Sequence, residues 1–181
     1  MSNFPAITAL LFGLRNCLIE TGTSPEHPFP APGALQALAW LQQQQVPCAW
    51  IDELPGTDTA QLAGQLPAWL NAHTGPTPWP APDACWQALM NLKAGKLEGC
   101  VLVSGEPRLL QSGLNAGLWT IGLARCGPTC TTDTPQELEH KRAKATLQLF
   151  AMGVHSVIDH LEALSDCLAD IAQRRLKGEK P

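Results

Sequence analysis

The chain has 181 residues, of which 45% are hydrophobic and 15% are charged. This length fits one domain with a complete hydrophobic core, and the apolar share is too high for a disordered chain. The 16 acidic and 12 basic residues give a net charge of −4, which excludes the strongly basic surface typical of nucleic-acid-binding proteins.

The first apolar run, AITALLF at residues 6–12, is short, ends at Gly13 and is not preceded by basic residues. It predicts a buried strand rather than a signal peptide or membrane span. Seven cysteines, an odd number without the spacing of a disulfide framework, favour reduced thiols. We therefore expect a cytoplasmic protein that does not associate with membranes.

Further along the chain, helical spacing of Leu35, Leu38 and Leu41 predicts a helix that stops before Pro47, followed by a strand in VPCAWI. Asp58 and Gln61 have the spacing of a capping box and predict a helix running to Leu70, which Pro67 should kink or end. The next segment, residues 71–82, is so rich in proline and glycine that it predicts a loop in place of a strand.

The second half alternates regularly between the two kinds of element. A helix is expected from Pro82 to Gly95, a strand in GCVLVSG, a helix in PRLLQSGLNAG and a strand in LWTIGLA. After a loop at residues 125–134, Thr134 and Glu137 begin a helix with apolar positions at Leu138, Leu147 and Phe150. A short strand at 155–158 precedes a last helix with Leu161, Leu164, Leu168 and Ile171 on one face.

Strands alternating with helices predict a mainly parallel sheet covered on both faces, with ligands bound beyond the carboxyl ends of the strands. Residues 13–17, 52–56 and 104–107 follow three of these strands. We therefore expect these three loops to converge and to carry any chemistry.

Three stretches, at residues 7–22, 77–124 and 140–164, resemble the phosphonoacetaldehyde hydrolases of the haloacid dehalogenase superfamily. They cover well over half of the chain, occur in the family's order and include GLNAGLWTIGL at 113–123. The resemblance implies an α/β Rossmann-like three-layer sandwich with a mainly parallel sheet. It also implies a single core domain over residues 1–181 without the family's cap, because only a short linker, about 21–30, stands where the cap is inserted.

Members of that family use an aspartate nucleophile after the first strand, a hydroxyl after the second, a cation in the third motif and acids that hold Mg²⁺. The corresponding positions of this sequence lack those groups, and we expect the catalytic motifs and the magnesium site to be lost. These positions are Gly13 for the nucleophile, Arg15 and Cys17 in its loop, Ile51 or Asp52, Trp79, and Gly105 with Leu109 for the acids.

Several residues near these positions have alternative roles. Arg15 either binds an anion or pairs with Asp52 or Glu106 in a filled pocket. Asp52, Glu53 and Glu106 are solvated loop acids, or they perform acid and base chemistry if they meet. Asn16 and Ser104 are also expected to line this pocket, while Cys17 is either a support of its loop or a nucleophile.

Outside this pocket, Cys126 and Cys130 have three residues between them, which favours an ordinary loop over a redox or metal site with His140. Trp79 and Trp86, beside the proline-rich segment, are candidates for a face that binds a protein partner. His73, His155 and His160 are interpreted as structural residues.

We expect a catalytically inactive protein with a binding, regulatory or scaffold role, without a cofactor or metal, whose partner is a protein or a small anion. The alternative is a hydrolase with relocated catalytic residues among Asp52, Glu53, Glu106 and Cys17. A lesser hypothesis is a nucleotide or anion site formed by Arg15 and the helix start after Gly105. The sequence leaves the oligomeric state open.

Overall fold

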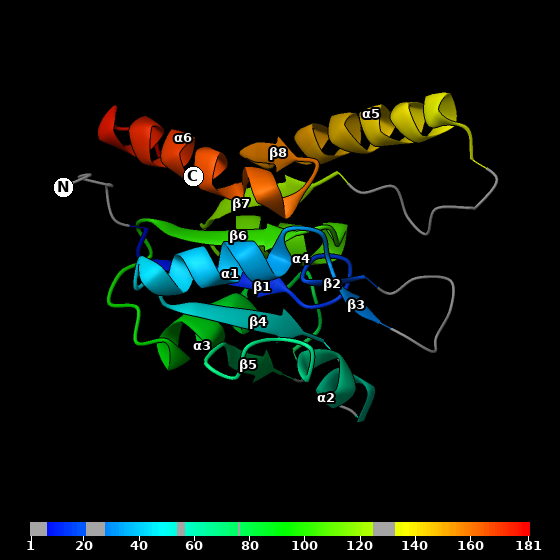
Figure 1. Ribbon diagram of the computed structural model, residues 1–181. Coiled ribbons are helices and arrows are strands. Elements are labelled where there is room, and N and C mark those ends of the chain that lie inside the picture. Colours follow the sequence, from blue (N-terminus) through cyan, green and yellow to red (C-terminus); the bar gives the residue numbers. More distant parts are fainter. Residues whose placement is uncertain (1–6, 21–27, 54–56, 76, 125–132) are drawn as a thin grey trace.

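The structure is a computed structural model that describes residues 7–20, 28–53, 57–75, 77–124 and 133–181. Strands and helices alternate along the chain (Figure 1). The strands are β1 (Ala9–Gly13), β2 (Ile19–Glu20), β3 (Phe29–Pro30), β4 (Cys48–Asp52), β5 (Asn71–Thr74), β6 (Cys100–Ser104), β7 (Trp119–Leu123) and β8 (Ser156–Ile158). The helices are α1 (Ala34–Gln43), α2 (Thr57–Ala63), α3 (Asp83–Asn91), α4 (Pro107–Asn115), α5 (Pro135–Ala151), the 3₁₀ turn η1 (Leu161–Ala163) and α6 (Leu164–Leu176).

Six strands form one parallel sheet in the order β5-β4-β1-β6-β7-β8. The fold class expected from the alternation of strands and helices is therefore confirmed. β1 lies at the centre, and Phe12 at its carboxyl end is level with Trp50 of β4 and Val103 of β6. The loops that follow β1, β4 and β6 consequently leave the sheet at the same edge.

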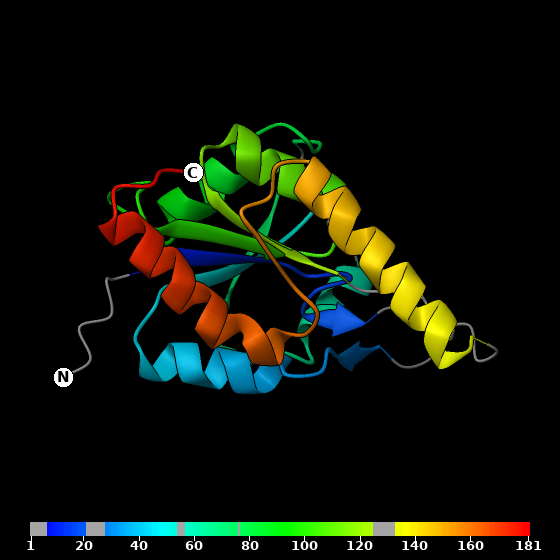
Figure 2. The same cartoon turned by 90° about the horizontal axis from the view of Figure 1, so that it is seen from above.

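Helices cover both faces of the sheet, as Figure 2 shows from above. On one face, α1 and α6 bury Leu38, Leu41, Leu164, Leu168 and Ile171 against the central strands. On the other face, α3 and α4 contribute Ala84, Cys85, Ala88, Leu89 and Leu109 to a second core cluster. β1, β4 and β6 are buried throughout, which explains why their sequences are continuous apolar runs.

Two predicted boundaries are wrong. Residues Asn71–Thr74 form the edge strand β5 instead of a loop, because their backbone pairs with β4 while only His73 is buried. Backbone pairing at an edge needs little apolar sequence, so the pattern did not reveal it. Helix α2 ends at Ala63, just before Gly64, and not at Leu70.

Helix α5 begins as predicted, because the side chain of Thr134 accepts from the Glu137 N–H and Glu137 reciprocates in a capping box. Its expected apolar face is wrong: Leu147 is 71% and Phe150 is 51% exposed, and Leu149 is the buried position instead. On α1, Leu35 is likewise 43% exposed, although Leu38 and Leu41 are buried.

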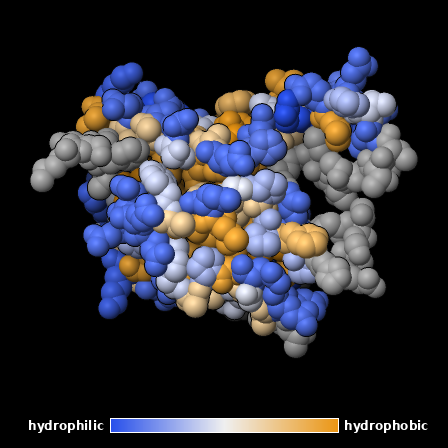
Figure 3. Space-filling model, viewed as in Figure 1, coloured by the Kyte–Doolittle hydropathy of each residue, from blue (hydrophilic) through white to orange (hydrophobic). Residues whose placement is uncertain are grey.

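The face of the molecule seen in Figure 3 is mostly hydrophilic, with hydrophobic residues gathered near its middle. Within the described residues, no helix has the length and apolarity needed to cross a membrane. Of the short linker expected at about 21–30 in place of a cap, residues 21–27 lie outside the described residues. The strands on either side of them, β2 and β3, pair in an antiparallel ribbon.

Candidate functional site

The loops after β1, β4 and β6 converge on a pocket of about 190 Å³ at the carboxyl edge of the sheet. This confirms that residues near the ends of these three strands meet. The pocket is lined by Arg15, Asn16, Asp52, Glu53, Trp79, Glu106, Arg108 and Leu109. Ser104, which was also expected there, is fully buried beneath the pocket and does not line it.

Arg15 extends from the loop after β1 to the end of β4. Its Nε donates to Oδ2 of Asp52 at 3.1 Å, and its Nη2 donates to the hydroxyl of Thr59 on α2 at 3.3 Å. Thr59 in turn donates to the same Asp52 oxygen at 3.0 Å. The carboxylate of Asp52 is buried at 4% exposure, so the guanidinium compensates a charge that water does not reach. Of the two partners proposed for Arg15, Asp52 is the one it binds.

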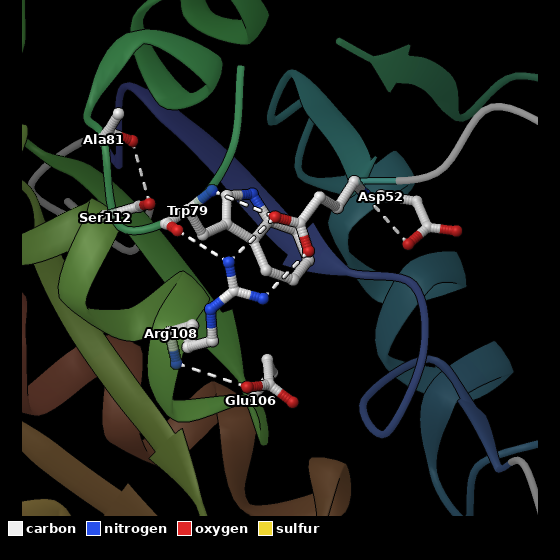
Figure 4. Close-up of polar contacts among 7 residues, drawn as sticks. Asp52, Trp79, Ala81, Glu106, Arg108 and Ser112 are labelled. Carbon is white, nitrogen blue, oxygen red and sulfur yellow. Dashed lines mark hydrogen bonds and ion pairs between the residues drawn. The ribbon is translucent and has the colours of Figure 1, made fainter. Parts of the chain in front are cut away.

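Arg108, which the sequence analysis missed, holds the other side of the pocket. Its Nη1 and Nη2 donate to the two carboxylate oxygens of Glu53 at 3.1 and 3.0 Å, and Nη2 also donates to the Trp79 carbonyl at 2.7 Å. Figure 4 shows this guanidinium directed toward Trp79. The backbone N–H of Trp79 also donates to Oε1 of Glu53, at 3.2 Å. The signal for Arg108 was its place in the first turn of the helix that follows Gly105.

Glu106 has a local structural role as the cap of helix α4. Its side chain accepts from the Arg108 N–H at 3.3 Å and caps α4, while its own N–H donates to the Ser104 hydroxyl at 3.0 Å. It therefore does not form the ion pair with Arg15 that was considered as an alternative. The three candidate carboxylates line one pocket, but Asp52 and Glu53 each bind a different arginine.

Gly13, at the position of the family's nucleophile, faces packed side chains. A Cβ atom added there would lie 2.8 Å from Oγ of Ser104 and 3.3 Å from Cδ2 of Leu109. Contacts below 3.0 Å are not tolerated without a shift of the neighbouring atoms. Because Ser104 and Leu109 are both fully buried, neither can move into solvent to make room.

Gly105, at the position of the family's first metal-binding acid, has even less room for a side chain than Gly13. A Cβ atom there would lie 2.3 Å from the backbone oxygen of Asn16. Asn16 has a φ of 56°, in the left-handed region that asparagine tolerates, and its loop folds back onto the end of β6. With Leu109 at the second acid position, the described residues form no group of three potential metal ligands, so this site does not fit the family's Mg²⁺.

Cys17 is fully buried, and its thiol donates to the Val103 carbonyl at 3.5 Å. It packs in the core beneath the loop and does not line the pocket, which favours the structural role over the nucleophile. Burial also raises the pKa of the Cys48 and Cys85 thiols to about 12, so these two cysteines are protonated at neutral pH.

Trp86 is 42% exposed and anchored by a hydrogen bond from its Nε1 to the Ala116 carbonyl, whereas Trp79 is half-buried and belongs to the pocket. His73 is buried, His155 is half-buried and His160 is exposed. Cys126 and Cys130 lie outside the described residues.

Comparison with known proteins gives a consistent relationship. No family model matches the sequence. A phosphonoacetaldehyde hydrolase of Salmonella enteritidis PT4 is 29% identical over 170 residues, covering 84% of this chain and 62% of that protein. This chain thus spans less than two thirds of the length of the curated relatives it matches.

Among solved structures, one crystal structure is 54% identical with a TM-score of 0.89, covering 97% of this chain and all of that chain. A phosphonoacetaldehyde hydrolase-like protein from Oleispira antarctica is 25% identical with a TM-score of 0.72, covering 84% of this chain and 60% of that chain. A haloacid dehalogenase family hydrolase from Deinococcus radiodurans R1, 18% identical with a TM-score of 0.69 over 94% of this chain and 98% of its own, shares the fold.

The parallel sheet and the pocket at its carboxyl edge give this chain a haloacid dehalogenase-like fold. Its sequence is similar to that of the phosphonoacetaldehyde hydrolases, and the chain is therefore related to hydrolases of that superfamily.

Proposed function

We propose that this chain is a binding protein derived from the phosphonoacetaldehyde hydrolases and that it does not hydrolyse phosphonates or phosphate esters. The observation that carries the proposal is the close packing around Gly13. A covalent mechanism needs a carboxylate at this point, and a Cβ atom would lie 2.8 Å from Ser104. Removing a nucleophile eliminates the mechanism itself rather than slowing it.

The proposal extends to the metal and the cap. Asp52 binds Arg15 and Glu53 binds Arg108, so the nearby carboxylates are used in ion pairs instead of in a site for a hard divalent cation. We therefore propose that the chain needs no Mg²⁺ and no other cofactor. We also propose a single capless core domain and a cytoplasmic location, the latter from the number and spacing of the cysteines.

The guanidinium groups of Arg15 and Arg108, whose side chains are 34% and 55% exposed, support a small anion as the ligand of the pocket. Asp52 and Glu53 pair with these groups and Glu106 caps α4, so the anion would compete with three carboxylates of the chain itself. Asp52 and Glu53 hold these cations in fixed positions, which lowers the entropy lost when an anion binds.

The binding role is tested by thermal unfolding of the chain with inorganic phosphate or methylphosphonate and without added metal. A ligand that binds only the folded state raises Tm. At a ligand concentration one hundred times Kd, the free energy of unfolding rises by about 2.7 kcal/mol. We expect this rise to disappear in Arg108→Gln and to persist in Arg142→Gln, a control on α5 away from the pocket. Equal shifts in both variants would refute binding in this pocket.

The second candidate is a hydrolase with relocated catalytic groups. It is favoured by the names of the relatives, which are hydrolases, and by the presence of Asp52, Glu53 and Glu106 in one pocket. Such an enzyme would use one of these carboxylates as a general base toward water. Release of phosphate that is lost in an Asp52→Asn, Glu106→Gln double variant would establish it.

A further inference from the structure

The carboxylate of Glu53 is held by three donors that converge on one side of the pocket. Its Oε2 accepts from Nη1 of Arg108 at 3.1 Å, and its Oε1 accepts from Nη2 of Arg108 at 3.0 Å and from the backbone N–H of Trp79 at 3.2 Å. A guanidinium that binds both oxygens of a carboxylate is among the strongest pairs that arginine forms with an anion. These three donors therefore make a site for a planar carboxylate, and Glu53 fills it.

The pair between Arg108 and Glu53 is open to competition from solution. The side chains of Arg108 and Glu53 are 55% and 25% exposed, whereas the Asp52 side chain that binds Arg15 is 5% exposed. Exposed ion pairs contribute little to stability, because water and dissolved ions replace either partner at little cost. Glu53 is therefore the exchangeable carboxylate of the pocket, while Asp52 stays with Arg15.

The charges of the pocket limit which ligand can replace Glu53. Two arginines and three carboxylates line the pocket, which gives these groups a formal net charge of −1. When Glu53 turns into solvent, the remaining four groups are balanced, and a monoanion restores the original charge. A dianion brings one more negative charge into the same pocket of about 190 Å³ as the buried carboxylate of Asp52. Because like charges at short range repel, a monoanionic carboxylate is favoured over a dianionic phosphate.

Trp79 provides a further donor that the chain does not use. This residue lines the pocket together with Arg108, as Figure 4 shows, and its indole Nε1 is buried without a hydrogen-bond partner among the described residues. A buried donor without an acceptor is unfavourable. Glu53 accepts from the backbone N–H of Trp79, so the indole remains available to a ligand that carries a second acceptor atom.

We propose that the ligand of this pocket is a small monoanionic carboxylate and that Glu53 is its internal competitor. The ligand binds by exchange: its carboxylate takes the two bonds from Arg108 and the bond from the Trp79 N–H, and Glu53 moves into solvent. The competitor weakens binding in proportion to the fraction of molecules in which the site is open. This inference rests on the proposed binding function and specifies the ligand class and the control of that same site.

Thermal unfolding of the full chain with acetate or inorganic phosphate tests the proposal. The two anions are compared at matched ionic strength and at about pH 8, where phosphate is mainly a dianion, and the rise of Tm with concentration gives each Kd. Glu53→Ala should lower the Kd for acetate by about three- to tenfold, because the site is then always open. Glu53→Gln keeps the size of the side chain without its charge, so its Kd should lie between the other two. The gain for acetate should exceed the gain for phosphate.

Glu139→Ala is the matched control, because Glu139 also pairs with an arginine, Arg142, but lies on α5 and does not line the pocket. It should bind acetate like the wild type. Adding Arg108→Gln to Glu53→Ala should abolish the gain, which locates it at this guanidinium. Circular dichroism checks the fold of each variant, and Glu53→Gln carries the comparison if Glu53→Ala does not fold.

The possible results separate this inference from the proposed function. An equal Kd for acetate in the wild type and in both Glu53 variants would overturn the internal competitor and leave anion binding in place. A larger gain for phosphate than for acetate would overturn it as well, since the substitution would then act through net charge alone. If neither anion raised the Tm of any of these proteins, the proposed function would fail and this inference with it.

Discussion

The guanidinium of Arg15 lies 3.1 Å from the carboxylate of Asp52, and this ion pair bridges the ends of the two adjacent strands β1 and β4. The carboxylate is almost fully buried, while the Arg15 side chain is 34% exposed. The pair therefore fixes one wall of the pocket at the carboxyl edge of the sheet.

Loss of Arg15 should destabilise the protein because, among the described residues, the buried charge of Asp52 would then keep its bonds to Thr59 and to the Glu53 N–H and lose its cation. We expect Arg15→Ala to lower the free energy of unfolding by about 1–3 kcal/mol, less than for a fully buried pair because Arg15 is partly solvated. Arg108→Ala, at a 55% exposed arginine, should cost about 0–1 kcal/mol. Urea unfolding measures both, and equal losses would contradict this ranking.

A side chain at position 13 should destabilise the protein because the surrounding atoms leave no space for it. Gly13→Ala would bring Cβ within 2.8 Å of Ser104 Oγ, and we expect a loss of about 1–3 kcal/mol from overpacking. Ser104→Ala should relieve part of this loss in the double variant. Gly95→Ala is the control, since a Cβ atom there meets nothing within 4 Å. A Gly13→Ala variant as stable as Gly95→Ala would show that the region is not closed.

The stability of the fold should decrease in mild acid because of His155. Burial, followed by the positive charge of Arg174, lowers the pKa of His155 from its ordinary value of 6.5, and its Nδ1 accepts from the Thr120 N–H at 3.0 Å. The unfolded chain then binds more protons than the folded one as pH falls through 6.5 toward the folded pKa. Stability should therefore fall in that window and stay constant above it.

Urea unfolding between pH 5 and 8, the range in which histidine titrates, measures this dependence. Burial also lowers the pKa of His73, which acts in the same direction. His155→Asn keeps an acceptor but does not titrate, so it should reduce the slope. His160→Asn, at an exposed position, should retain the wild-type slope. An identical slope in both variants would exclude His155 as a cause.

The capping box of α5 should stabilise the first turn of this helix. Thr134→Ala removes the bond from the Glu137 N–H to the Thr134 hydroxyl, at 3.3 Å, and should cost the first turn about 1 kcal/mol. Because residues 135–144 do not contribute to the core, faster hydrogen exchange should appear there while global unfolding changes little. Thr134→Ser keeps the hydroxyl and should exchange like the wild type. Uniformly faster exchange would contradict this.

Much of the fold follows from short-range patterns. The apolar runs at β1, β4, β6 and β7 predicted buried parallel strands, and Thr134 with Glu137 predicted the start of α5. β5 was missed because an edge strand is specified by backbone pairing to β4, which a polar sequence does not reveal. Leu147 and Phe150 were predicted as apolar positions of α5, and both are exposed, because a periodic pattern does not show which apolar positions pack within the chain.

The site was only partly predictable for a similar reason. The order of parallel strands brought Arg15 and Asp52 together, as expected from their positions after β1 and β4. Arg108 was missed because its partner Glu53 is 55 residues away and the intervening chain passes through β5 and α3. The close packing of Gly13 against Ser104 and of Gly105 against Asn16 depends on distances that sequence spacing does not contain.

We propose that this chain does not hydrolyse phosphonates or phosphate esters, because Gly13 and Gly105 have no room for the carboxylates of the family's mechanism. The most direct test is the release of phosphate from phosphonoacetaldehyde and a broad panel of phosphate esters with Mg²⁺, comparing the wild type with the Asp52→Asn, Glu106→Gln double variant. We expect both proteins to release no more phosphate than the protein-free blank. Turnover by the wild type that disappears in the double variant would contradict it and would locate a new active site at these carboxylates.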